Sequence, residues 1–122
     1  MPMKKVLIIE DSPMVRENIA EFLEFKGYDI LVATNGKDGF ELARRNMPHI
    51  IVCDVKMPKT DGFEVLDLLK RDGTTCQIPF VFLSALSQKD DLERGLKSAA
   101  DAYLIKPVSM EALIQTIEDL TA

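Results

Sequence analysis

The sequence has no tryptophan, one histidine and two cysteines, so several common kinds of functional site are not expected. Cys53 and Cys76 form no CxxC pair, which argues against a zinc site made with cysteine. Two isolated cysteines also make no disulfide framework. We interpret them as buried or incidental thiols of a protein in the reducing cytoplasm.

Basic residues and long apolar runs are also scarce. The chain has 15 Lys and Arg against 20 Asp and Glu, which gives a formal net charge of −5. This balance argues against a surface for nucleic acid or for an anionic membrane. No apolar run approaches the roughly 18 residues of a membrane helix. The N-terminal stretch MPMKKVLIIEDS carries acids where a signal peptide has small neutral residues, so we expect a soluble, cytoplasmic protein.

What is present is a regular alternation of two kinds of segment. The 122 residues, 47% of them hydrophobic, suit a single domain over residues 1–122. Short apolar segments alternate five times with segments of helical period, and this predicts a five-stranded parallel sheet with helices on both faces. The expected strands are residues 6–10, 29–34, 49–54, 79–85 and 102–106.

Local signals mark the ends of several expected helices. Ser12 is a suitable N-cap and Pro13 a suitable first helical residue. Ser87, with Asp90 three residues later, has the spacing of a capping box and predicts the start of a fourth helix. The last helix is expected to follow Ser109.

Polar residues stand at the carboxyl ends of four of the expected strands, the edge where open α/β sheets bind their ligands. They are Glu10 and Asp11, Asp54, Ser84 and Lys106. If the first and third strands are neighbours, three carboxylates share one pocket and need a cation among them. Oxygen ligands suit Mg²⁺, while a lysine and a hydroxyl can donate to phosphoryl oxygens. The set predicts phosphoryl transfer to an aspartate.

Taken singly, these residues have simpler interpretations. The acidic pair could begin a solvated loop or cap a helix. Asp54 could form a turn, and Ser84 could be a core or capping hydroxyl. Lys106 could be a surface lysine and Tyr103 a half-buried core aromatic. Their convergence on one edge of one sheet favours the functional interpretation.

Four motifs, in order, resemble those of the receiver domains of bacterial two-component response regulators. They are IIEDS, IIVCDVKMPKTDGFEVL, FLSA and YLIKP, and together they span nearly the whole chain. The string D-x-x-M-P-x-x-D-G is the most specific of them. The resemblance, which is to the chemotaxis-regulator type, implies a (βα)5 flavodoxin-like sandwich with strand order 2-1-3-4-5. It also implies a signalling switch activated by phosphorylation.

The resemblance implies a role for each residue of the site. Asp54 would accept a phosphoryl group from a sensor histidine kinase or a histidine phosphotransfer protein. Lys106 and Ser84 would contact phosphoryl oxygens. The implied ligands of Mg²⁺ or Mn²⁺ are Asp11, Asp54, the backbone carbonyl of Lys56 and, through water, Glu10, which replaces the more usual aspartate.

Other positions would transmit or time the signal. Inward movement of Ser84 would free space for Tyr103 to rotate, and this would reshape the face formed by the fourth helix, fifth strand and fifth helix. That face would bind a downstream effector or form a phosphorylation-dependent homodimer. Lys56 and Leu86 stand where this family tunes the lifetime of the phosphoryl group. The resemblance also implies a cis bond before Pro107.

One departure from the family pattern is Ala99-Ala100, which stands where Gly-Ala is usual. If that glycine supplies a positive φ, Ala99 is strained or the loop differs.

Functions of other classes fit less well. A phosphohydrolase with an aspartyl-phosphate intermediate usually has a second aspartate two residues after the nucleophile, where Lys56 stands, and a cap domain that this chain has no room for. A nucleotide- or flavin-binding domain lacks its glycine-rich loop here. An unphosphorylated adaptor has no positive support, since every acceptor residue is present. We therefore expect a switch that takes up a phosphoryl group and slowly loses it, and not a turnover enzyme.

Overall fold

The computed structural model of the protein describes residues 3–85, 93–95 and 97–122. Leu86 and the predicted helix start at Ser87 and Asp90 lie outside the described residues, while residues 93–95 are helical. The strands are β1 (Lys5–Ile9), β2 (Asp29–Ala33), β3 (Ile50–Asp54), β4 (Phe80–Ala85) and β5 (Ala102–Lys106). The helices are α1 (Pro13–Phe25), α2 (Gly36–Asn46), α3 (Gly62–Arg71) and α5 (Met110–Thr121).

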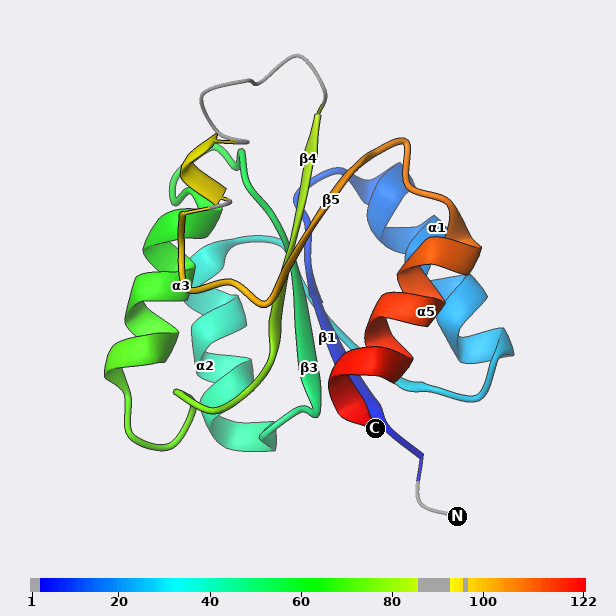
Figure 1. Cartoon of the computed structure of the whole chain (residues 1–122), viewed down its shortest axis with the longest axis horizontal. Coiled ribbons are helices and arrows are strands. Elements are labelled where there is room, and N and C mark those ends of the chain that lie inside the picture. Colours follow the sequence, from blue (N-terminus) through cyan, green and yellow to red (C-terminus); the bar gives the residue numbers. More distant parts are fainter. Residues whose placement is uncertain (1–2, 86–92, 96) are drawn as a thin grey trace.

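All five strands run parallel, in the order β2-β1-β3-β4-β5. Helices α1 and α5 cover one face of the sheet, and α2 and α3 cover the other (Figure 1). The predicted doubly wound, flavodoxin-like sandwich with strand order 2-1-3-4-5 is therefore confirmed. Within the described part of the chain, none of the helices has the length and apolar content that a membrane crossing requires.

The two cores of the sandwich explain why the central strands are apolar without interruption. Side chains alternate between the faces of a strand, so a strand covered on both sides needs apolar residues at every position. In β1, Leu7 and Ile9 pack in the core beneath α2 and α3, whereas Val6 and Ile8 pack in the core beneath α1 and α5. The same alternation decides which face each residue at the strand ends occupies.

Three of the helices labelled α1, α2, α3 and α5 begin at a side-chain cap, and α1 is the exception. Asn35, Asp61 and Ser109 are N-caps whose side chains accept hydrogen bonds from backbone N–H groups in the first turns of α2, α3 and α5. Helix α1 begins at Pro13 as predicted, but Ser12 makes no side-chain capping bond. The turn between β1 and α1 is therefore held by something other than its expected cap.

The structure answers two expectations about the backbone, which concern the bond before Pro107 and the conformation of Ala99. The Lys106–Pro107 bond is cis, as implied. Among the described residues, Met47 is the one non-glycine residue with a positive φ, so Ala99 carries no such strain. The departure from the usual Gly-Ala is thus tolerated without the left-handed backbone that would favour glycine.

Candidate functional site

Strand register brings the predicted site residues to one edge of the sheet. In the pairing of β1 with β3, Ile9 lies opposite Cys53, so Glu10 and Asp54 follow side by side. In the pairing of β4 with β5, Ala85 lies opposite Lys106. The carboxyl ends of β1, β3 and β5 therefore deliver two acids and a lysine to one place.

Three carboxylates cluster there, as predicted. One oxygen from each of Glu10, Asp11 and Asp54 lies within 4.8 Å of the other two. Glu10 is 1% exposed and Asp54 is 7% exposed, so two of the three acids have lost most of their water. A set of oxygen donors at this spacing fits a hard divalent cation such as Mg²⁺.

Lys106 lies among these acids and binds two of them. Its Nζ is 3.1 Å from Glu10 Oε1 and 3.2 Å from Asp54 Oδ1. The Nζ also donates to Glu10 Oε2 at 3.3 Å, so the contact with Glu10 is bidentate on the acid side. The resemblance assigned Glu10 to the metal and Lys106 to a phosphoryl oxygen. The direct Glu10–Lys106 ion pair was not anticipated.

Burial sets the protonation of the cluster. Burial and, next in size, the charge of Asp54 raise the pKa of Glu10 from 4.5 to about 7, although Lys106 opposes the shift. Burial also raises the pKa of Asp54, again against the opposing effect of Lys106. Burial alone would lower the pKa of Lys106, but Asp54 and Glu10 outweigh it and the pKa is raised. Burial thus favours the neutral, protonated forms of Glu10 and Asp54, while Lys106 stays protonated and positively charged.

Ser84 and Tyr103 belong to the opposite face of the sheet. Ser84 is 1% exposed, and strand alternation places it with Phe82 on the α2 and α3 side. Its Oγ donates to the carbonyl oxygen of Ala85 at 3.4 Å. Tyr103 packs on the same side, with its ring centroid 5.8 Å from that of Phe82. By the same alternation, Glu10, Asp54 and Lys106 belong to the α1 and α5 side, so Ser84 and Tyr103 approach the shared edge from the other side of the sheet.

The ring of Tyr103 also fills the space beside Gly95 in the helical turn 93–95. A Cβ built at position 95 would overlap the Cε2 and Cδ2 atoms of Tyr103. Position 95 is buried, and its lack of a side chain is what admits the ring. Sequence reasoning did not single out Gly95, because its partner is on another element.

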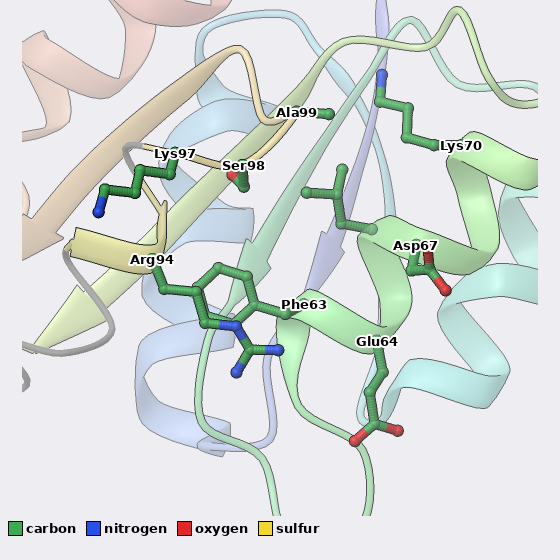
Figure 2. A pocket seen from close by; sticks show the side chains of 9 residues that line it. Phe63, Glu64, Asp67, Lys70, Arg94, Lys97, Ser98 and Ala99 are labelled. Atoms are coloured by element: carbon green, nitrogen blue, oxygen red, sulfur yellow. The ribbon is translucent and has the colours of Figure 1, made fainter.

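The same helical turn is joined to the start of α3. The guanidinium of Arg94 lies 4.1 Å from the ring centroid of Phe63, and its Nη1 is 3.9 Å from Asp61 Oδ2. Phe63 and Arg94 border a cavity of about 560 Å³, which is also lined by Lys97, Ser98 and Ala99 and is separate from the acidic cluster (Figure 2). Both acids and bases line this cavity, so it has no single electrostatic preference.

The loop after Asp54 passes very close to the start of α3. The backbone N–H of Gly62 donates to the carbonyl oxygen of Val55 at 2.7 Å. A Cβ at position 62 would lie 2.5 Å from the carbonyl oxygen of Asp54 and 2.9 Å from Cε1 of Phe82. Lys56, in the same loop, is exposed, and its predicted role as a metal ligand through its carbonyl stays a prediction.

Replacing Gly62 by alanine should therefore disturb Asp54 directly. Overpacking against the backbone of residue 54 is expected to lower the free energy of unfolding by about 1–3 kcal/mol. Urea denaturation measures this, with Gly73→Ala as the control, because a Cβ at position 73 meets nothing within 4 Å. Equal effects of the two substitutions would show that the close approach at Gly62 is relieved without cost.

The parallel α/β sandwich with clustered acids and a lysine at its strand ends is the arrangement that the resemblance to receiver domains implied. The sequence from residue 6 to residue 118 matches the response regulator receiver domain, and the chain belongs to this family, which is part of two-component systems.

Two curated relatives and two solved structures illustrate the similarity. The chain is 36% identical to Protein PilH of Pseudomonas aeruginosa over 120 residues, which are 98% of the chain and 99% of PilH. It is 39% identical over 118 residues, 97% of the chain, to the DNA-binding dual master transcriptional regulator RpaA of Synechocystis, of which it spans only 49%. The receiver domain of the Francisella response regulator 1452 has 35% identity and a TM-score of 0.86, covering 97% of this chain and 96% of that one. The chemotaxis response regulator CheY4 of Vibrio cholerae has 26% identity and a TM-score of 0.88, covering 98% and 99%.

Proposed function

We propose that this domain is a phosphorylation-activated switch whose phosphoacceptor is Asp54. The observation that carries the proposal is the position of its carboxylate. Asp54 is buried at the end of β3, it lies within the acidic cluster, and its Oδ1 is 3.2 Å from Lys106 Nζ. A nucleophilic carboxylate beside a fixed cation and a cation-binding set of oxygens suits transfer of a phosphoryl group.

Glu10, Asp11, Asp54 and the backbone carbonyl of Lys56 would hold Mg²⁺ or Mn²⁺. When bound, the ion would offset the repulsion between the Asp54 carboxylate and the oxygens of an incoming phosphoryl group. A carboxylate oxygen of Asp54 forms a bond to phosphorus as the bond from phosphorus to the histidine nitrogen of the donor breaks. Lys106 then balances the charge of a phosphoryl oxygen, having been held at the site by Glu10 and Asp54.

The donor would be a sensor histidine kinase or a histidine phosphotransfer protein in the cytoplasm. Ser84 would bind another phosphoryl oxygen, and this would couple the site to Tyr103 and to the face that includes β5 and α5. A population shift at that face would change binding to a downstream effector or to a second copy of the domain. The bound group would be lost slowly, with Lys56 and Leu86 setting its lifetime, so the domain would not turn over as an enzyme.

Incubation with acetyl phosphate and Mg²⁺, followed by intact mass spectrometry, tests the proposal. One phosphoryl group is expected on the wild-type chain and none on Asp54→Asn. Labelling should also be lost in EDTA and in Asp11→Ala, because the cluster would then lack its ion or one of its ligands. An adduct that persists in Asp54→Asn would place the acceptor elsewhere and would refute the proposal.

A further inference from the structure

Arg16 of α1 contacts Glu10 and Asp11 through their backbone carbonyl groups and not through their carboxylates. Its Nη1 donates to the carbonyl oxygen of Glu10 at 3.0 Å and to that of Asp11 at 3.4 Å. The backbone N–H of Arg16 also donates to the carbonyl oxygen of Ser12 at 3.0 Å. One residue therefore holds three consecutive carbonyl groups of the turn that joins β1 to α1.

The expected cap of α1 does not restrain this turn. Ser12 makes no side-chain capping bond, and Pro13 has no backbone N–H. On the strand side, the backbone N–H of Glu10 donates to the carbonyl oxygen of Ala33 at 3.0 Å. The position of the Glu10 and Asp11 peptide groups thus depends on Ala33 at one end and on Arg16 at the other.

We propose that Arg16 is a positioning residue of the metal site, which holds the peptide groups of Glu10 and Asp11 so that their carboxylates converge with Asp54. Fixed carbonyl groups restrict the backbone dihedral angles from which both carboxylates project. A charged donor makes stronger hydrogen bonds than a neutral one, and removal of a partner that orients metal ligands typically lowers metal affinity by about 10–100-fold. The inference rests on the proposed function insofar as it assumes that the cluster binds Mg²⁺.

Arg16 could affect Mg²⁺ affinity through its charge or by positioning the ligands, and the two roles predict opposite changes in affinity when Arg16 is replaced by alanine. A cation beside an acidic cluster repels Mg²⁺, so the loss of its charge alone would tighten binding a few-fold. The loss of positioning would weaken binding, because the ligands would no longer be held together before the ion arrives. The direction of the change in affinity therefore separates the two roles.

Isothermal titration of Mg²⁺ into Arg16→Ala provides the test, with the exposed Arg45 of α2 changed to alanine as a control of equal charge. The dissociation constant for Mg²⁺ should rise about tenfold in Arg16→Ala and stay unchanged in Arg45→Ala. The rate of labelling by acetyl phosphate at saturating Mg²⁺ should stay within about twofold of wild type, since Arg16 touches neither the ion nor Asp54 in this role. An unchanged or tighter dissociation constant in Arg16→Ala would overturn the inference.

Arg16→Lys keeps the charge but presents its donors from one point, so its dissociation constant should lie between those of wild type and Arg16→Ala. If Arg16→Ala does not fold, this variant decides: weaker Mg²⁺ binding than wild type supports the inference, and equal binding overturns it. Failure of the proposed function would be seen in a different measurement, the uptake of a phosphoryl group by the wild-type chain. In that case the wild-type chain takes up no phosphoryl group on Asp54, whatever the variants of Arg16 do to Mg²⁺ binding.

Discussion

Replacing Glu10 by glutamine should stabilise the magnesium-free protein at pH 8, even though it removes a residue of the site. The folded protein raises the pKa of Glu10 from 4.5 to about 7, chiefly by burial. Between these values the folded chain holds a proton that the unfolded chain has released, so stability falls as the pH rises through this interval. Above the folded-state pKa, the ionised carboxylate costs up to about 3 kcal/mol, which glutamine would avoid.

Urea denaturation in EDTA at pH 5 and pH 8 measures this effect. The advantage of Glu10→Gln over wild type should be large at pH 8 and should shrink towards pH 5, where the folded protein keeps Glu10 protonated. Glu17→Gln, on the exposed side of α1, is the matched control and should show no such dependence. A wild-type protein whose stability does not fall relative to Glu10→Gln between pH 5 and pH 8 would contradict the prediction. Saturating Mg²⁺ should reduce the advantage, because the ion favours the ionised acid.

Replacing Lys106 by methionine should have the opposite effect and should destabilise the protein. Lys106 is the cation that pairs with both Glu10 and Asp54, and its removal would leave two buried carboxylates close together. Breaking a buried ion pair costs about 3–5 kcal/mol; the side chain of Lys106 is 23% exposed, so we expect about 2–3 kcal/mol at pH 8. The loss should be smaller at pH 5, where Glu10, with its pKa raised to about 7, is protonated and no longer needs the cation.

The comparison for Lys106→Met is Lys37→Met, which removes an exposed lysine of α2 and should change stability by less than about 0.5 kcal/mol. The double variant Glu10→Gln/Lys106→Met adds a direct measure of the coupling. The double variant should be more stable than the sum of the two single changes implies, because only one carboxylate is then left without its partner. Strict additivity would show that Glu10 and Lys106 do not stabilise each other.

The position of the acidic cluster could be predicted because it depends on strand order and on where apolar segments end. Uninterrupted apolar runs such as VLII and IIVC indicated strands buried on both faces, and the residues that follow each run had to meet at one edge. The Glu10–Lys106 ion pair could not be derived in the same way. It depends on how far the Lys106 side chain reaches from the end of β5 past β4 and β3 to the end of β1, and the two residues are 96 positions apart in the chain.

The role of Arg16 was missed for a related reason. The expected N-cap at Ser12 and Pro13 accounted for the start of α1, and nothing in a sequence distinguishes an arginine that folds back over its own turn from one in solvent. The hydrogen bonds at Glu10 and Asp11 show that the expected cap does not hold this turn. Face assignment at Ser84 and Tyr103, by contrast, follows directly from strand alternation.

Gly95 and the ring of Tyr103 share one packing space, so the sizes of the side chains at these two positions depend on each other. The ring of Tyr103 occupies the place where a side chain at position 95 would begin, so neither residue can enlarge without the other shrinking or moving. A change to alanine at position 95 would act on the population of tyrosine orientations without touching any residue of the acidic cluster. In related sequences the two positions should therefore vary together, with a bulkier residue at one matched by a smaller residue at the other.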